Sequence, residues 1–394
     1  MSVGISRATG SVRTAVSALF FANGMMIGSW APKLPVLMER LEISESTAGM
    51  VVLCLGLGSI SLMPVFGAMT ARHGSARAVK LSALLGVPTL LLMTLAPNLI
   101  LVMIAVLLFG GFMGGMDVSM NANAVAVERI RRRAIMSSCH GFWSLGGVVG
   151  AGVGGVALSE LGEASHAILA TLAFCAVLAF ALPSMLVDAP DEREARTPLR
   201  LPRSPLPYII GVMALCCMIP EGAILDWGAV YLQREMGASL SLSGWAFAAC
   251  AATMALLRFL GDFLRQKLGA VTTLRISATI AIAGLGIAGM AQQPLIAIMG
   301  FGFAGLGIAN LVPIMFSAAG NLPLLAPGVG LSVVTTMGYS GILLAPGSIG
   351  FLAESMSFST IYLGLAALLL APLLMSPLAR TADFADDDGA AATT

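Results

Sequence analysis

Charged residues are scarce in this sequence. Only 10% of its 394 residues are Asp, Glu, Lys or Arg, whereas hydrophobic residues make up 58% and the mean hydropathy is +0.93. A soluble core of this size cannot bury so much apolar surface, so the composition predicts a polytopic membrane protein in contact with a lipid bilayer. The formal net charge of +1 provides no basic excess, and we expect no nucleic-acid partner.

The sequence also lacks the patterns that hold metals, nucleotides and disulfides. Its six cysteines lie inside apolar runs and show no paired spacing in polar loops, so neither a disulfide framework nor a metal site is expected. The absence of a GxxxxGK(S/T) stretch argues against direct drive by ATP. We therefore expect no cofactor, no bound metal and no enzymatic activity.

Twelve apolar runs are long enough to cross a bilayer as helices. The first, from about Thr14 to Leu37, is longer than a signal-peptide core and has no cleavage signature after it, so we expect it to remain as a span. The predicted fold is an all-α membrane protein with twelve transmembrane helices. Their centres lie near Met25, Gly58, Leu90, Phe112, Val148, Val177, Ile219, Met254, Ile282, Gly307, Gly341 and Ala367.

A polar stretch rich in charge and proline, residues 188–207, divides six runs from six and is typical of a linker. The halves resemble each other at an offset of about 194 to 198 residues, because Asn23 precedes Trp30 much as Glu221 precedes Trp227. We predict two pseudo-symmetric six-helix bundles. The expected units are an N-terminal bundle (1–187), a cytoplasmic linker (188–207), a C-terminal bundle (208–380) and a disordered acidic tail (381–394).

The lysines and arginines fall mainly on one side of this topology. An even number of spans places both termini on the same side, and only Lys33, Arg40 and Arg234 fall on the other. Because basic loops remain in the cytoplasm, both termini are expected there, with the protein in a bacterial inner (plasma) membrane.

The fourth run, from Leu99 to Val127, contains a carboxylate. At helical spacing, Gly110, Asp117 and Asn121 share one face. A charge near the bilayer centre costs roughly 2.5 to 3.5 kcal/mol, so this face should look into the protein. Burial there favours the neutral acid, which predicts that Asp117 binds a proton. Asn121 either binds substrate or hydrogen-bonds a neighbouring helix.

A second carboxylate, Glu221, lies near mid-membrane in the seventh run, between a proline and a glycine. Helix breakers on both sides of Glu221 predict a broken helix that lines a cavity. His140, at the start of the fifth run, either relays protons or hydrogen-bonds a neighbouring helix. Tyr231 is expected in the aromatic belt at the membrane surface, whereas Trp227 belongs either to that belt or to a ligand site.

Glycines and basic residues recur in the loops after the second and eighth runs, GAMTARHGSAR (67–77) and GDFLRQKLG (261–269). Such loops could brace the two bundles, although the preference of basic residues for the cytoplasm also explains the arginines. The candidate gating residues are Gly67, Arg72, Gly74, Arg77, Gly261, Asp262 and Arg265.

With these features the chain resembles the major facilitator superfamily and, within it, the fucose permease-like branch of bacterial sugar:proton symporters and relatives of the rhizopine transport protein. The resemblance implies that the fourth-span acid, Asp117, helps couple protons to sugar. Two positions depart from the family pattern: Ala71 replaces the usual acid of the loop after the second span, and residues 24–35 of the first span contain no acid. The branch resemblance rests on Asp117 with Asn121, His140 followed by FWSLGG, Glu221 leading to Trp227 and Tyr231, PIMFS (313–317), and residues 338–350 with Pro346.

The resemblance implies a monomeric secondary transporter of a small organic solute, with a sugar or sugar derivative favoured, that couples to protons and works by alternating access. Its central site would lie between the first, fourth, seventh and tenth spans. A proton-coupled exporter of drugs or metabolites is the alternative, whereas a receptor or scaffold would not need two carboxylates in lipid. The expected proton-coupling residues are Asp117, Glu221 and His140, and the expected substrate-binding residues are Asn23, Asn121, Trp143, Glu221, Trp227, Asn310 and Tyr339.

The predicted orientation can be tested by thiol labelling of intact cells. In a cysteine-free background, a single cysteine replacing Arg131 should be protected from a membrane-impermeant thiol reagent, because its loop is assigned to the cytoplasm. A cysteine replacing Glu42, on the opposite side, should be labelled. The reverse pattern would overturn the topology.

Overall fold

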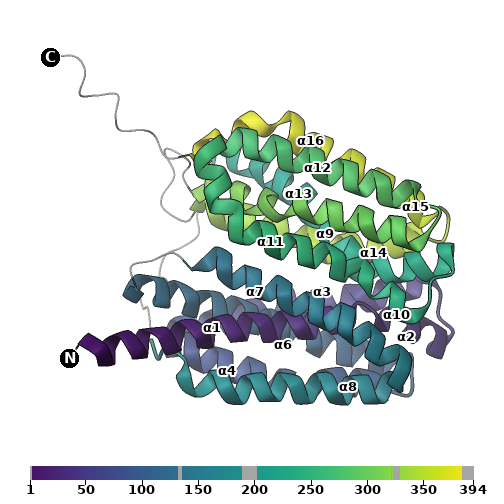
Figure 1. The fold of residues 1–394 in the computed structure, drawn as a ribbon, viewed down its shortest axis with the longest axis horizontal. Coiled ribbons are helices and arrows are strands. Elements are labelled where there is room, and N and C mark those ends of the chain that lie inside the picture. The colour runs from purple at the N-terminus through teal and green to yellow at the C-terminus, as the bar shows by residue number, and fades with distance from the viewer. Residues whose placement is uncertain (1, 132–134, 189–201, 321, 323–328, 384–394) are drawn as a thin grey trace.

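The computed structural model describes residues 2–131, 135–188, 202–320, 322 and 329–383, and every regular element in these ranges is a helix (Figure 1). This confirms the all-α prediction. Most of the expected linker (189–201) and of the expected acidic tail (384–394) lies outside the described residues.

The first half of the chain forms a bundle of helices, one of which is broken at a glycine. Gly162, inside α8, has φ +81°, a backbone conformation that favours glycine, and there the chain turns between two helical limbs. The elements are α1 (Ser2–Trp30), α2 (Lys33–Leu41), α3 (Glu45–His73), α4 (Ser75–Gly86), α5 (Thr89–Leu95), α6 (Leu99–Arg131), α7 (Met136–Val148), the π-helix η1 (Val149–Val153), α8 (Gly154–Ala181) and the 3₁₀ turn η2 (Leu182–Ser184).

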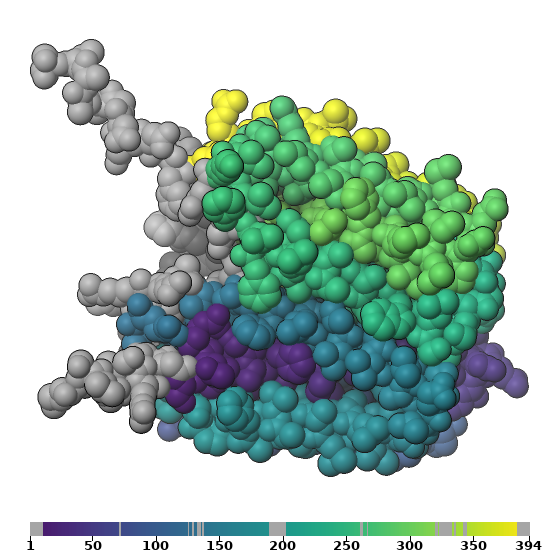
Figure 2. All heavy atoms as spheres, in the orientation of Figure 1, coloured from purple at the N-terminus to yellow at the C-terminus, as the bar shows by residue number. Residues whose placement is uncertain are grey.

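The second half forms a bundle of similar design, stacked on the first (Figures 1 and 2). Contrary to expectation, α9 runs unbroken through Pro220, so Glu221 lies on a continuous helix. The elements are α9 (Leu206–Met236), α10 (Leu240–Ser243), α11 (Trp245–Leu268), α12 (Ala270–Met290), α13 (Pro294–Gly320), α14 (Val329–Leu352), α15 (Phe358–Leu368), α16 (Leu370–Leu374) and the 3₁₀ helix η4 (Ser376–Ala382).

The helix lengths are consistent with twelve membrane spans. Within the described ranges, nine helical segments are long and apolar enough to cross a bilayer, and a bent pair over residues 358–382 makes ten. One of the nine, Ser138–Ser184, has 47 residues and contains the turn at Gly162, so it supplies two crossings. α14, with 24 residues, is also long enough to cross.

Glycine faces hold the helices of the first half together. A Cβ atom at Gly110 of α6 would lie 1.9 Å from the carbonyl oxygen of Leu55 in α3, and one at Gly146 of α7 would lie 2.1 Å from that of Phe21 in α1. Lipid provides no hydrophobic drive for helix association, so such close backbone contact supplies much of the packing energy. The glycine face predicted for the fourth span therefore packs against the second.

The internal repeat is visible in two matching helix starts. Gly74 and Gly269 both have positive φ, +84° and +75°, immediately before α4 and α12. The carboxylate of Asp188 accepts hydrogen bonds from the backbone N–H of Ser75, both at 3.0 Å, and Asp383 accepts from Ala270 at 2.8 and 3.0 Å. Both pairs follow the offset predicted from sequence.

The position of Asp383 corrects one expectation. Residues 381–383 were assigned to a disordered tail, but Thr381 lies in η4 and its hydroxyl donates to the carbonyl of Ala318 at 3.0 Å. Asp383 then reaches the start of α12, because the first N–H groups of a helix have no partner within it. The folded chain therefore extends at least to Asp383.

Asp188 and Asp383 are expected to stabilise their halves as helix caps. Replacing either by Ala removes the acceptor and should destabilise the protein by about 1 kcal/mol, whereas Asn keeps one acceptor oxygen and should cost less. Thermal unfolding of the purified protein, followed by tryptophan fluorescence, measures the difference. Equal melting temperatures for wild type and both Ala variants would show that the caps contribute nothing.

Candidate functional site

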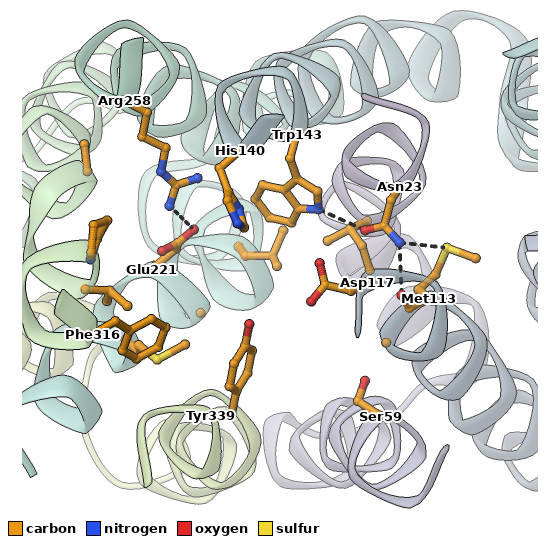
Figure 3. A pocket seen from close by; sticks show the side chains of 18 of the residues that line it. Asn23, Ser59, Met113, Asp117, His140, Trp143, Glu221, Arg258, Phe316 and Tyr339 are labelled. Atoms are coloured by element: carbon orange, nitrogen blue, oxygen red, sulfur yellow. Dashed lines mark hydrogen bonds and ion pairs between the residues drawn. The ribbon is translucent and has the colours of Figure 1, made fainter. Parts of the chain in front are cut away.

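A cavity of about 490 Å³ lies between the two halves of the molecule. Helices of the first half (α1, α3, α6, α7) and of the second (α9, α11, α12, α13, α14) contribute to its wall, more than the four spans expected from sequence. Figure 3 shows side chains from both halves that point into the cavity. We call the end of the molecule where α1 begins the terminal side and the opposite end the distal side. Arg265 and Thr273 line the cavity toward the terminal side, and Asp226 lines it toward the distal side.

Asp117 points into the middle of the cavity from α6 (Figure 3). Among the described residues, no basic side chain lies within ion-pair distance of its carboxylate. The side-chain amide of Asn121 donates to Asp117 Oδ1 at 3.2 Å and to the Asp117 carbonyl at 2.9 Å. Asn121 does not line the cavity, and its described hydrogen bonds lie within α6 rather than reaching a neighbouring helix, so neither alternative expected from sequence is observed. Its amide instead orients the acid.

Glu221 enters the cavity from α9 and forms an ion pair with Arg258 of α11, with 3.5 Å between the charged atoms. Arg258 also donates to the hydroxyl of Ser144 in α7 at 2.8 Å, so its guanidinium joins a carboxylate of its own half to the other half. Both charged side chains are about 85% buried. The Ser144 hydroxyl accepts from a second nitrogen of the guanidinium, which helps to stabilise the buried cation.

The sequence interpretation missed Arg258. It lies within the eighth apolar run, ALLRFLGDF, only three residues before the glycine of the basic loop. Arginines close to a span end commonly extend to the membrane surface, so its position did not separate it from the loop. The signal that identifies it is the pairing rule: Glu221 lies in an apolar helix and requires a cation from a neighbouring span.

Asn23 and Trp143 form one hydrogen-bonded unit on the wall of the first half (Figure 3). The Trp143 indole N–H donates to Asn23 Oδ1 at 2.9 Å, and the Asn23 amide donates to the carbonyl of Met113 at 3.0 Å. Asn23 is buried, so its amide serves mainly to fix the indole, whose ring lines the cavity. His140 lies beside this unit, with its ring packed edge-on against Phe20 at 5.2 Å.

Two further predicted substrate residues also line the cavity, both from the second half. Asn310 of α13 contributes a buried amide. Tyr339 of α14 directs its hydroxyl toward the centre, between Glu221 and Asp117 (Figure 3). The cavity thus combines aromatic faces, amides and carboxylates on a mostly apolar wall, as small-molecule sites do.

Two aromatic expectations were wrong for this conformation. Trp227 has no exposed surface, donates to the carbonyl of Pro346 at 3.0 Å and packs on Phe358, so it does not reach the cavity. Tyr231 is equally buried and donates to the carbonyl of Ala288 at 2.7 Å, so it does not belong to an aromatic belt in lipid. Both rings pack within the second half.

The predicted gating loops make no bracing contact between the halves in the described part of the chain. Gly74 approaches Asp188 of its own half, and Arg72 and Arg77 are exposed and form no ion pair with any described residue. Arg265 lines the terminal side of the cavity and donates to the carbonyl of Ala382. Gly67 lies on α3 facing Val118 of α6, again within one half. The surroundings of Gly261 and the side chain of Asp262 lie outside the described set.

Comparison with known proteins agrees with this architecture. A family model described as Major Facilitator Superfamily matches residues 16–346. The chain is 36% identical over 366 residues to an uncharacterized MFS-type transporter of Yersinia pestis, covering 92% of this chain and 94% of that protein. It is 30% identical over 344 residues to the membrane protein MosC of Rhizobium meliloti, covering 87% and 84%.

Solved transporter structures share the fold. A mutant of the nucleoside transporter NupG superposes with a TM-score of 0.74 at 13% sequence identity, covering 93% of this chain and 99% of that one. A variant of the E. coli fucose:proton symporter FucP superposes with a TM-score of 0.63 at 15% identity, covering 94% and 98%. The family model and the relatives span most of the sequence, and the chain therefore belongs to the Major Facilitator Superfamily of membrane transporters.

Proposed function

We propose that this protein is a proton-coupled transporter of a small polar organic solute, with a sugar or sugar derivative favoured, and that it works by alternating access. The observation that carries the proposal is the Asp117 carboxylate, which faces the central cavity with an amide neighbour but no cation among the described residues. A buried acid in that position is stable when it holds a proton and can release it when water reaches it.

The rest of the cavity supports a polar, ring-shaped solute. Trp143 offers a fixed aromatic face, and Tyr339 and Asn310 offer hydrogen-bonding groups from the other half. A solute held between them would touch both halves, which is what a transporter needs if binding is to change their relative position. Fucose and nucleosides, named for the solved transporters FucP and NupG, are solutes of this kind.

A proton gradient provides enough energy for such work. In a bacterial inner membrane with both termini in the cytoplasm, one proton moving down ~100 mV and one pH unit releases about 2.3 plus 1.4 kcal/mol. That sum corresponds to accumulation of several hundredfold for one proton per solute.

Asp117→Asn tests the proposal directly. The amide mimics the protonated acid permanently, so substrate binding and exchange should survive while accumulation driven by a pH gradient falls to the background level. The measurement is uptake into proteoliposomes with and without an imposed pH gradient, beside substrate affinity as a function of pH.

A purely structural Asp117 gives a different result. An isosteric amide would then change stability by about 1 kcal/mol and leave coupling intact. Glu160→Gln, an exposed carboxylate on α8, serves as the matched control and should behave as wild type. Gradient-driven accumulation by Asp117→Asn at the wild-type level would refute the proton-site assignment.

Glu221→Gln is expected to insert and fold but to bind substrate at least about tenfold more weakly. The substitution leaves the Arg258 charge without its carboxylate, and an unpaired buried charge rearranges its surroundings. Binding to purified protein and size-exclusion profiles measure the two effects separately. Normal affinity in a well-folded variant would give Glu221 a structural role only.

A further inference from the structure

One buried hydrogen bond joins the two halves at the distal side of the cavity. The indole N–H of Trp30, the last residue of α1, donates to Asp226 Oδ1 in α9 at 3.0 Å. Trp30 has no exposed surface and Asp226 is 4% exposed. In the described part of the chain no basic side chain pairs with Asp226, and the Trp30 indole is the hydrogen-bond donor that its carboxylate has there.

The residues at the equivalent positions of the internal repeat do not form a matching contact between the halves. At the repeat offset, Trp30 corresponds to Trp227 and Ser29 to Asp226. Trp227 donates to Pro346 within its own half, and Ser29 donates to Met25 within its own helix at 2.8 Å. Only one member of each corresponding pair reaches across the interface, so packing inside a bundle does not require the Trp30-to-Asp226 bond.

The Trp30-to-Asp226 bond lies next to the region of the distal side where helices of the two halves are in close contact. Farther toward the distal side, a Cβ atom at Gly350 of α14 would lie 2.6 Å from the carbonyl oxygen of Glu45 in α3, and the Glu45 carboxylate pairs with Arg234 of α9 at 3.1 Å. In the opposite direction the cavity continues toward Arg265. The bond therefore separates the cavity from the closed distal side.

We propose that the Trp30-to-Asp226 hydrogen bond is the latch that holds the distal side closed, and that Asp226 is a positioning residue for the transport cycle. The proposal rests on the proposed alternating-access function. Opening the distal side separates α1 from α9, so the bond must break in every cycle. Water that enters can then solvate the carboxylate, which replaces the lost donor.

Removing the donor alone should shift the conformational balance. Trp30→Phe keeps an aromatic ring but leaves Asp226 buried without a partner in the closed state, so the distal-open state becomes relatively more stable. The ratio of distal-open to distal-closed molecules should rise about tenfold. Asp226→Asn keeps an acceptor oxygen and should retain the parental ratio. Trp30→Phe combined with Asp226→Leu removes both partners, so the ratio should return toward the parental value.

Distances between spin labels report the ratio without any need for a known substrate. In a cysteine-free background, labels at Glu39 and Met356, both exposed, span the distal side, and labels at Arg77 and Lys267 span the terminal side. In nanodiscs, Trp30→Phe should lengthen the first distance and shorten the second. Trp245→Phe, an exposed ring on α11, is the matched control and should change neither.

The outcomes separate the latch from the transport proposal. Parental distances at both label pairs in a monodisperse Trp30→Phe protein would overturn the latch, whatever Asp117→Asn does to accumulation. If Trp30→Phe does not fold, Asp226→Ala removes the acceptor instead and must shift the distances in the same direction, or the proposal fails. Conversely, a transport assay that refutes proton coupling at Asp117 would not change the spin-label distances expected for Trp30→Phe, so the two proposals can fail separately.

Discussion

The cost of placing polar groups in lipid governs this structure. A carboxylate that faced hydrocarbon would be strongly unfavourable, so each acid of the membrane region turns toward the cavity between the halves. Among the described residues each is then stabilised differently: Glu221 by the Arg258 cation, Asp226 by the indole of Trp30, and Asp117 by the amide of Asn121. These groups require an interior between the helices, and the cavity provides it.

The polar contacts between the halves differ in kind from those inside each half. Arg258 with Ser144, Trp30 with Asp226 and Arg234 with Glu45 join one half to the other. Asp188 and Asp383 instead cap helices within a single half. Under the alternating access proposed above, contacts within a half would persist through a cycle, while contacts between halves would exchange. Such a division would allow the two bundles to move as bodies around a fixed site.

The sequence predicted the features that depend on composition and on isolated charges. Asp117 and Glu221 were assigned to the interior because a carboxylate in an apolar helix is strongly unfavourable when it faces lipid. Both line the cavity. Trp227 and Tyr231 were harder, because an aromatic ring near a span end has the same pattern whether it faces lipid or a neighbouring helix. Their partners, Pro346 and Ala288, belong to distant segments that only the tertiary structure brings together. Arg258 and Asp383 were missed for the same reason, since each acts on an element far away in the chain.

The crossing of Gly350 with α3 has a mechanical consequence. Backbone there meets backbone, because a Cβ atom at Gly350 would also lie 2.7 Å from the Cα atom of Gly49. The amide and carbonyl groups inside a helix are already hydrogen-bonded, so parting two such backbones leaves few polar atoms without a partner. If the halves separate as proposed, this crossing would offer little resistance, and the polar contacts around it would set the position of the closed state.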